Sequence, residues 1–288
     1  MRVLVTGGSG HLGSRVVRHL IEHGYSVVNA DRRPLESEIE PDRADVYSYR
    51  ELDLTDVGQV AGAMAGVDAV VHLGAIPAPG RHPDETIFRQ NTTSTFAVLH
   101  SASLLGIRRA VIASSLSALG MAYATHPFTP LYAPVDEEHP LLPQDPYGLS
   151  KQVDESIAAT FCRRTGMTIL AYRFQWIASV QQASETAEAL RDEPEQLAHN
   201  LWGWVDLRDA AAACRLGLEA EVEGFEAFNI TAGDTVAYQP TADLIRRYCP
   251  KTELRAELEG VASGFSTEKA RRMLGYTPRH TWRQPARE

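Results

Sequence analysis

The chain has 288 residues, of which 44% are hydrophobic and 23% are charged, so it has the composition of an ordinary globular protein with room for one large α/β domain and a smaller appendage. Lys and Arg total 28 against 37 Asp and Glu, and a formal net charge of −9 argues against nucleic-acid binding, which requires a basic face. The three cysteines lie far apart in the sequence, which excludes a disulfide framework and any cysteine pair with metal-ligand spacing.

The N-terminal sequence predicts neither secretion nor membrane insertion. It begins with a predicted strand over 2–5, without the charged segment and apolar run of a signal peptide. No stretch approaches the roughly 18 apolar residues that a membrane span needs. We therefore expect a soluble, cytoplasmic protein that does not associate with a membrane.

The first half of the chain alternates short apolar runs with helical patterns. Apolar runs predict strands at 3–5, 26–30, 47–52, 69–73, 110–113 and 168–172. Apolar residues at helical spacing, with glycine stops, predict helices from Leu12 to Gly24, over 84–105 and over 147–164. Strands that alternate with helices predict an α/β fold, a doubly wound parallel sheet of the Rossmann type with helices on both faces.

Two segments depart from this alternation. Six prolines between residues 123 and 146 predict a long loop, and a long loop after a sheet strand is often functional. Residues 178–200 are polar and rich in Glu and Gln, which favours a solvated helix, with a mobile lid as the alternative.

A glycine-rich turn joins the first predicted strand to the first predicted helix. From Gly7 the sequence reads Gly-Gly-Ser-Gly-His-Leu-Gly, which fits both G-x-x-G-x-x-G from Gly7 and G-x-G-x-x-G from Gly8. Glycines here allow a tight turn and close approach of the backbone to a pyrophosphate, while the helix N-terminus offers N–H groups to the phosphates. Because the strand and helix flank the motif as required, the turn predicts dinucleotide binding.

Acidic residues after the second and third strands indicate which dinucleotide binds. Asp31 ends the second strand, where a carboxylate can accept hydrogen bonds from the adenosine ribose and would repel a 2′-phosphate, which favours NAD. Arg32 and Arg33 follow at once and would suit that phosphate, so NADP is the alternative. Asp53 either accepts a hydrogen bond from the adenine amino group or caps the helix expected near Thr55.

Tyr147 and Lys151 lie four residues apart at the start of a predicted helix and therefore share one face. An ammonium beside a phenol favours the phenolate, which could take a proton from a substrate hydroxyl as hydride leaves, or return it. The same lysine can reach the nicotinamide ribose. The pair alone occurs on surface helices by chance, but here Ser114 and Ser115 end the fifth predicted strand, at the sheet edge where ligands bind.

These motifs together resemble the extended short-chain dehydrogenase/reductases of the NAD-dependent epimerase/dehydratase family. Similar segments occur at 6–13, 71–75, 91–95, 113–120, 204–210, 228–230 and 269–278. The resemblance implies a catalytic triad of Ser115, Tyr147 and Lys151, with Ser115 assigned by counting back from Gly120, and no metal. The cofactor-binding residues that it implies are Gly7, Gly10, His11, Leu12, Gly13, Asp31, Arg32, Asp53, Leu54, Leu73, Gly74, Ala75, Asn91, Ser114, Tyr147 and Lys151.

The resemblance also implies the domain organisation and a homodimer. A Rossmann domain is expected over 1–175, with a core that also takes in about 201–230. A small substrate-binding region is expected from 176–200 and 231–288. Members of the family often pair through the two long helices, here predicted at 84–105 and 147–164.

Departures from the nucleotide-sugar epimerases of the family bear on the substrate. Trp176 stands where those epimerases usually have an asparagine that helps to hold the nucleotide diphosphate, and Leu119 replaces their usual tyrosine. The segment 178–200 is also short for one that must bind a whole nucleotide. These features are more similar to the uronate dehydrogenases, which act on free sugar acids. Arg173 could then bind a substrate carboxylate bidentately, or form a structural salt bridge.

The sequence therefore predicts an NAD-dependent oxidoreductase that acts on a small-molecule sugar or sugar acid through its Ser-Tyr-Lys triad. A nucleotide-sugar 4-epimerase is the first alternative, because the same residues can serve both reactions. A regulator that senses the dinucleotide without catalysis is the second, and the intact triad argues against it.

Overall fold

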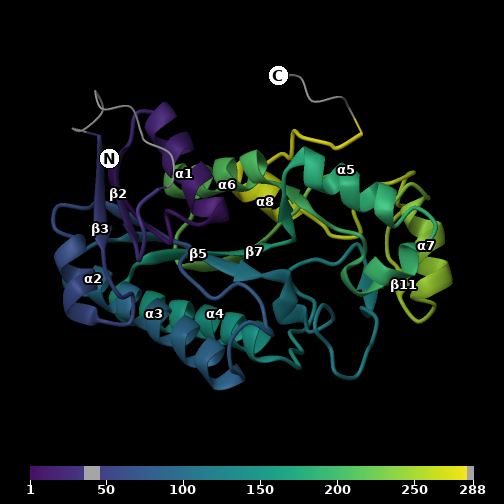
Figure 1. Ribbon diagram of the computed structural model, residues 1–288, viewed down its shortest axis with the longest axis horizontal. Helices are drawn as coiled ribbons and strands as arrows, with labels where there is room; N and C mark the ends of the chain where they lie inside the picture. The colour runs from purple at the N-terminus through teal and green to yellow at the C-terminus, as the bar shows by residue number, and fades with distance from the viewer. Residues whose placement is uncertain (36–45, 284–288) are drawn as a thin grey trace.

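The computed structural model describes residues 1–35 and 46–283 of the chain, and its centre is a seven-stranded sheet (Figure 1). All neighbouring strands of this sheet are parallel, in the order β10-β7-β5-β4-β1-β2-β3. The strand bounds are β1 Arg2–Thr6, β2 Ser26–Asp31, β3 Tyr47–Glu51, β4 Ala69–His72, β5 Arg109–Ser115, β7 Thr168–Phe174 and β10 Phe225–Ile230. The strand order changes direction between β1 and β4, which in open α/β sheets is where a ligand crevice opens. The predicted doubly wound fold is confirmed.

Helices cover both faces of the sheet (Figure 1). On one face lie α1 His11–Glu22, α6 Leu207–Glu219 and α8 Glu268–Leu274, and on the other lie α2 Val57–Ala63, α3 Asp84–Leu104 and α4 Pro146–Thr165. Successive side chains of a strand point to opposite faces, so Val3 and Val5 join the core under α1 and α6 while Leu4 joins the core under α3 and α4. Because both faces of the sheet centre are buried, central strands such as β1 and β4 are nearly continuous apolar runs in the sequence.

Capping residues fix the start and end of α4, the helix that carries Tyr147. The Asp145 carboxylate accepts hydrogen bonds from the backbone N–H groups of Tyr147 and Gly148, both at 2.9 Å. Pro146 occupies the first helical position, where its missing N–H costs nothing, and Gly166 ends the helix with φ 69°. These signals place Tyr147 in the first turn, at the edge of the sheet.

A third hydrophobic cluster forms beyond the end of the sheet. It contains Trp202, Trp204, Leu244 and Phe265 and is bordered by short elements. Those elements are η2 Leu116–Leu119, β6 Tyr132–Ala133, β8 Ile177–Ala178, α5 Val180–Ala189, η3 Pro194–Asn200, β9 Val205–Asp206, α7 Thr241–Tyr248 and β11 Glu253–Leu254. The cluster also takes in residues between 116 and 135, outside the predicted bounds of the small region. Residues 36–45 of the predicted Rossmann domain and 284–288 of the small region lie outside the described residues.

Two local predictions need correction. Residues 178–200 form α5 and a 3-10 helix rather than one solvated helix, and Ala183 and Ala187 of α5 are buried in the third cluster. The long loop over 123–146 contains the two-residue strand β6, which pairs with β11. None of the described helices is long and apolar enough to cross a membrane.

Candidate active site

Two adjoining cavities of about 720 and 500 Å³ open at the carboxyl ends of the central strands, and they share Gly7, Gly10, Leu73 and Ala75. Every residue predicted to bind cofactor or to act in catalysis lines one of them. The larger cavity takes His11, Leu12, Gly13, Ser114, Ser115, Tyr147 and Lys151, and the smaller takes Asp31, Arg32, Asp53, Leu54, Gly74 and Asn91. Arg173 lines neither cavity.

The glycine-rich turn has no room for side chains. Gly7 has φ 65°, and a Cβ atom there would lie 2.7 Å from the Cα of Gly74 on the neighbouring loop. A Cβ at Gly13 would overlap the carbonyl oxygen of Gly7 and lie 2.7 Å from the Cα of Gly8. Gly10 caps α1 without a side-chain hydrogen bond, and the first turn holds no acidic residue. The N-terminal N–H groups of α1 are therefore available to an anion in the cavity.

Asp31 and Arg32 lie on the wall of the smaller cavity, where β2 ends. The Asp31 carboxylate accepts hydrogen bonds from the backbone N–H of Ser9 at 3.0 Å and from that of Arg32 at 2.7 Å. These bonds fix the carboxylate beside the glycine-rich turn. The Arg32 side chain is 68% exposed and lies 3.9 Å from Asp53.

Asp53 lines the same cavity but does not cap a helix. Its carboxylate accepts hydrogen bonds from the backbone N–H and the hydroxyl of Thr55, both at 2.9 Å, and these bonds hold the pKa of Asp53 below its usual range. The helix begins at Val57, and its cap is Asp56, which accepts from the N–H of Gln59. The capping alternative for Asp53 is wrong, because the chain makes one further turn before the helix starts.

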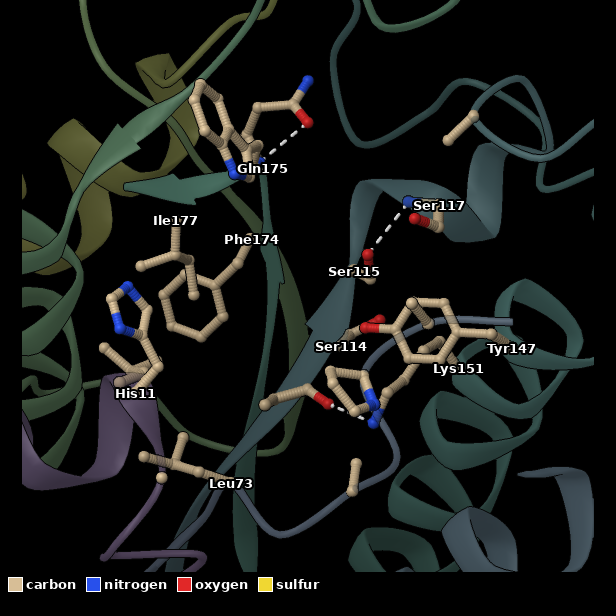
Figure 2. Close-up of a pocket in the computed structure, with 18 of the residues that line it drawn as sticks. His11, Leu73, Ser114, Ser115, Ser117, Tyr147, Lys151, Phe174, Gln175 and Ile177 are labelled. Carbon is tan, nitrogen blue, oxygen red and sulfur yellow. Dashed lines mark hydrogen bonds between the residues drawn. The ribbon is translucent and has the colours of Figure 1, made fainter. Parts of the chain in front are cut away.

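The three triad residues converge on the larger cavity from two neighbouring elements, opposite His11 and Ile177 (Figure 2). Ser115 is the last residue of β5, and its Oγ accepts a hydrogen bond from the N–H of Ser117 at 3.0 Å, which leaves the hydroxyl proton to donate. Tyr147 and Lys151 come from the first turns of α4, with Nζ 5.9 Å from the centre of the phenol ring. This arrangement can bind a substrate oxygen and move a proton to or from it.

Ser114 and Asn91 line the cavities, but their side-chain polar atoms form hydrogen bonds with other residues of the protein. Ser114 Oγ donates to Glu155 Oε1 at 2.6 Å. The Asn91 side-chain oxygen accepts a hydrogen bond from the N–H of Ile76 at 2.8 Å. Its amide nitrogen donates to the carbonyl of Ile76 at 3.1 Å and to Ser150 Oγ at 3.0 Å. These residues hold the loop after β4 and helix α4 against the sheet, and so position the groups that face the cavity.

Arg173 is buried in a salt bridge, so its predicted role in binding a substrate carboxylate needs correction. Its Nε and Nη2 donate to the two carboxylate oxygens of Glu155 at 2.9 and 2.8 Å, and Nη1 donates to the carbonyl of Glu137 at 3.0 Å. Burial disfavours the charge of Arg173, yet the hydrogen bonds to Glu155 leave its pKa raised. The structural alternative holds, because side-chain alternation along β7 directs Arg173 toward α4.

Replacing Arg173 by Met is expected to destabilise the fold by about 3–5 kcal/mol, because Glu155 keeps a buried charge without its partner. Urea unfolding measures this loss. The matched control is Arg246→Met, since Arg246 and Asp243 form a pair that is 65% exposed on both sides and worth at most about 1 kcal/mol. A stable Arg173→Met protein that had lost discrimination between acidic and neutral sugars would restore the original assignment.

Several residues of the larger cavity were missed because they come from loops, from α5 and from η3, which carry no recognisable motif. They are Pro77, Ala78, Arg81, Ala122, Tyr123, Gln175, Gln182, His199 and Asn200. Tyr123 packs its ring edge-on against Tyr147, with ring centres 6.4 Å apart, and burial raises the pKa of Tyr123. Gln175 donates to the carbonyl of Asn200 at 3.1 Å and so joins the end of β7 to η3. For these residues the sequence offered only one indication, the six prolines that predict a functional loop over 123–146.

Comparisons with known proteins agree with this geometry. The sequence model of the NAD dependent epimerase/dehydratase family matches residues 3–231. The chain is 27% identical to an NAD-dependent glucose-6-phosphate dehydrogenase of Haloferax volcanii, over 96% of this chain and 92% of that protein. It is 24% identical to a UDP-glucose 4-epimerase of Corynebacterium glutamicum, over 98% and 92%. A crystal structure of a short-chain dehydrogenase/reductase superfamily protein from Agrobacterium tumefaciens with bound NAD superposes with TM-score 0.73 at 24% identity, over 98% of this chain and 94% of that one.

Proposed function

Because the chain belongs to the NAD-dependent epimerase/dehydratase family of enzymes, we propose that it is an NAD-dependent dehydrogenase that oxidises a carbinol of a sugar or sugar acid. The observation that carries the proposal is the convergence of Ser115, Tyr147 and Lys151 on one cavity, next to the glycine-rich turn. A catalytically silent regulator would have no use for this arrangement.

The residues present fit a dinucleotide. The turn has no room for a Cβ at Gly7 or Gly13, and the uncapped N-terminus of α1 can take the pyrophosphate. Asp31 would hold the adenosine ribose and exclude a 2′-phosphate, which favours NAD over NADP. When bound, the nicotinamide supplies the hydride acceptor for oxidation.

Side chains of the protein bind the substrate hydroxyl and transfer its proton. Ser115 donates a hydrogen bond to the substrate oxygen and holds the hydroxyl in place. Tyr147 removes the hydroxyl proton as the carbon loses its hydride, and returns it in the reverse reaction. Lys151 favours the phenolate form of Tyr147 and offers an N–H to the nicotinamide ribose.

We further propose that the substrate carries an anionic group and binds between the sheet edge and the small region. Although the protein is acidic, no Asp or Glu is found among the described residues that line the larger cavity, while Arg81 and Lys151 do line it. Arg81 makes no ion pair or hydrogen bond within residues 1–35 and 46–283, so its guanidinium is available to a ligand in the cavity. Glucose-6-phosphate, named for the Haloferax relative, is a sugar of this kind.

Replacing Arg81 by Gln is expected to raise KM for the acidic sugar by roughly 10-fold or more, the value of a charge-assisted hydrogen bond, and to leave KM for NAD unchanged. Steady-state kinetics with paired acidic and neutral sugars measure the selectivity. Arg89→Gln is the matched control, because Arg89 is exposed on α3 and pairs with Glu85 outside the cavity. A rise in KM for NAD alone would instead assign Arg81 to the dinucleotide pyrophosphate.

A nucleotide-sugar 4-epimerase is the second candidate, supported by the match to the Corynebacterium epimerase over nearly the whole chain. Trp176 argues against it, because this large side chain lines the larger cavity where the epimerases usually have an asparagine. Conversion of UDP-glucose to UDP-galactose without accumulation of NADH would favour the epimerase.

We also propose a homodimer through α3 and α4, which pack against each other on one face of the sheet. Apolar side chains on or next to these helices remain exposed, among them Phe96 at 46% and Leu104 at 66%. Sedimentation equilibrium measures the oligomeric state, and a monomer at micromolar protein concentration would contradict the proposal.

A further inference from the structure

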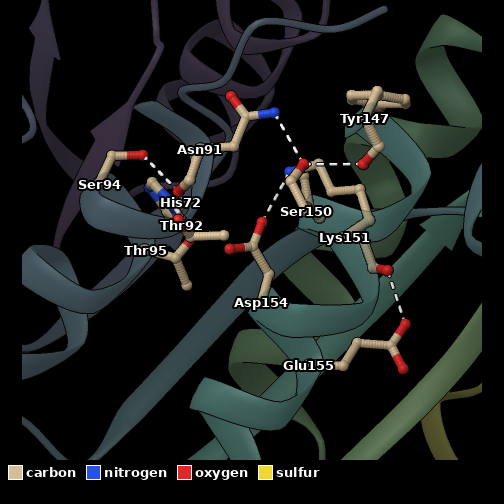
Figure 3. A network of polar contacts seen from close by, with 12 residues as sticks. His72, Asn91, Thr92, Ser94, Thr95, Tyr147, Ser150, Lys151, Asp154 and Glu155 are labelled. Atoms are coloured by element: carbon tan, nitrogen blue, oxygen red, sulfur yellow. Dashed lines mark hydrogen bonds and ion pairs between the residues drawn. The ribbon is translucent and has the colours of Figure 1, made fainter. Parts of the chain in front are cut away.

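The ammonium of Lys151 has a buried carboxylate partner, Asp154, on the next turn of α4 (Figure 3). Nζ lies 3.1 Å from Asp154 Oδ2, and the side chains of Lys151 and Asp154 are only 4% and 1% exposed. A second N–H of the ammonium donates to the carbonyl of Ala113 at 2.9 Å. An ammonium has three N–H donors, so one remains for the cavity that Lys151 lines.

No other charged group among the described residues balances this ammonium. The neighbouring Glu155 is paired through both oxygens with Arg173 on β7. His72 on β4 also faces Lys151, but burial, with the ammonium in addition, lowers the pKa of His72 to about 3, so it is neutral at neutral pH. Of the three groups, only Asp154 can neutralise Lys151.

Two further ionisable groups near Tyr147 are Tyr123, whose ring packs against the phenol, and Asp145, which caps α4. The Asp145 carboxylate accepts hydrogen bonds from the first N–H groups of α4, those of Tyr147 and Gly148. Burial raises the pKa of both Tyr123 and Asp145. Neither residue hydrogen-bonds to the ammonium of Lys151, whose bonds go to Ala113 and Asp154.

Two buried hydrogen bonds lead from β1 to Thr95, which lies near Asp154 (Figure 3 labels His72, Thr95 and Asp154). Thr6 Oγ1 lies 2.7 Å from His72 Nδ1, and His72 Nε2 lies 3.1 Å from Thr95 Oγ1. The Thr95 hydroxyl in turn favours the charged form of Asp154. With Thr6 donating to Nδ1 and Nε2–H donating to Thr95, each hydroxyl proton points along this series of bonds toward the carboxylate. These bonds therefore stabilise a negative charge on Asp154, against the burial that raises its pKa.

We propose that Asp154 is a positioning residue of this active site, which neutralises Lys151 and directs the remaining N–H of its ammonium into the cavity. The inference rests on the proposed function, because it assigns Asp154 a role through the Tyr147–Lys151 pair. A carboxylate behind the lysine weakens the attraction of the ammonium for a phenolate.

Asp154→Asn tests the inference, because the amide keeps an oxygen acceptor for Nζ and removes the charge. In the direction of alcohol oxidation, the acid limb of the pH profile of kcat/KM is expected to move to lower pH by roughly one unit. An unmoved limb, or one that moves to higher pH, would overturn the inference.

Two further variants separate this role from a general loss of stability. Asp209→Asn is the matched control, because Asp209 is also a buried aspartate, 3% exposed, but lies outside both cavities. Its carboxylate accepts hydrogen bonds from the backbone N–H groups of residues 279 and 280. This variant is expected to leave the limb in place. Thr95→Val removes the donor to Asp154 without touching Lys151, and is expected to shift the limb in the same direction by less. A Thr95→Val limb that moves to higher pH would contradict the inference even if Asp154→Asn fails to fold.

A readout without turnover distinguishes this inference from the proposed function. ¹³C-labelled tyrosine in the NAD complex is titrated by NMR, and the Tyr147 resonance is the one that Tyr147→Phe removes. The titration midpoint of Tyr147 is expected to fall in Asp154→Asn by the same unit or so. If this shift is found in a protein that oxidises no sugar, the proposed function fails and the inference stands. If sugar is oxidised and the midpoint is unmoved, the inference fails alone.

Discussion

Tyr147→Phe is expected to lower kcat/KM for alcohol oxidation by a factor of roughly 10²–10⁴, the usual contribution of a positioned acid or base. The phenol hydroxyl is the group proposed to take the substrate proton, and the Lys151 ammonium lies 5.9 Å from the ring centre, where it would favour the ionised form. Phenylalanine fills the same space, so the dissociation constant for NAD, measured by fluorescence titration, is expected to stay within about threefold.

Tyr123→Phe is the matched control for this prediction. Tyr123 lines the same cavity and contacts the Tyr147 ring, but it comes from the loop after η2 and has no ammonium partner. Its loss is expected to change kcat/KM by less than about 10-fold, the value of one hydrogen bond. A Tyr147→Phe protein that keeps most of its activity while Tyr123→Phe loses it would move the acid/base role to Tyr123.

Gly13→Ala is expected to weaken NAD binding by roughly 10- to 100-fold and to destabilise the fold by about 1–3 kcal/mol. The added Cβ would overlap the Gly7 carbonyl oxygen and lie 2.7 Å from the Cα of Gly8, and both are backbone atoms that cannot rotate away. Helix α1 must therefore move off the turn, which displaces the N–H groups proposed to hold the pyrophosphate. Calorimetric titration with NAD and urea unfolding measure the two effects.

Gly62→Ala provides the control for the same substitution at a site without contacts. Gly62 lies in α2, and apart from its chain neighbours and the backbone of its own helix, no described atom lies within 4 Å of the position that its Cβ would take. Alanine there is expected to stabilise the protein by about 0.5–1 kcal/mol, as it does in open helix positions, and to leave NAD binding unchanged. Unchanged NAD affinity in a folded Gly13→Ala protein would contradict the role of the turn.

The sheet could be predicted because its central strands are buried on both faces and so form nearly uninterrupted apolar runs, such as Val3 to Val5. The glycine-rich turn could be predicted because its geometry is local: a strand, a turn without side chains, and a helix follow one another in the chain. The Tyr147–Lys151 pair is local in the same sense. Asp145, Pro146 and Gly166 set the bounds of the helix that carries it.

The hydrogen-bond partners of Arg173 could not be predicted from the sequence motifs, because they depend on which face of the sheet its side chain points to. Arg173 lies opposite Ser114 in the register of β7 and β5, and both side chains reach Glu155 on α4. Phe174, one residue on, faces the other core. One residue of sequence thus separates a buried ion pair from the wall of the cavity, which Phe174 and Gln175 line.

Residues of the cavity wall beyond the triad were equally inaccessible from sequence. Arg81 and Tyr123 come from two loops and His199 from η3, and these segments are far apart in the sequence but line one cavity beside the third hydrophobic cluster. The carboxylate of Asp154 was inaccessible for a different reason. A single acidic residue three positions after Lys151 is as typical of an exposed helix face as of a buried ion pair.

The central claim is that this protein oxidises an acidic sugar with NAD, and absorbance at 340 nm tests it most directly. Purified protein is mixed with excess NAD and with sugar phosphates, sugar acids, their neutral counterparts and nucleotide sugars in turn. The account predicts a continuous rise in absorbance with a free acidic sugar, a slower rise with the neutral sugar, and almost none in Tyr147→Phe. No rise with any free sugar, together with isomerisation of a nucleotide sugar, would contradict the account and make the protein an epimerase.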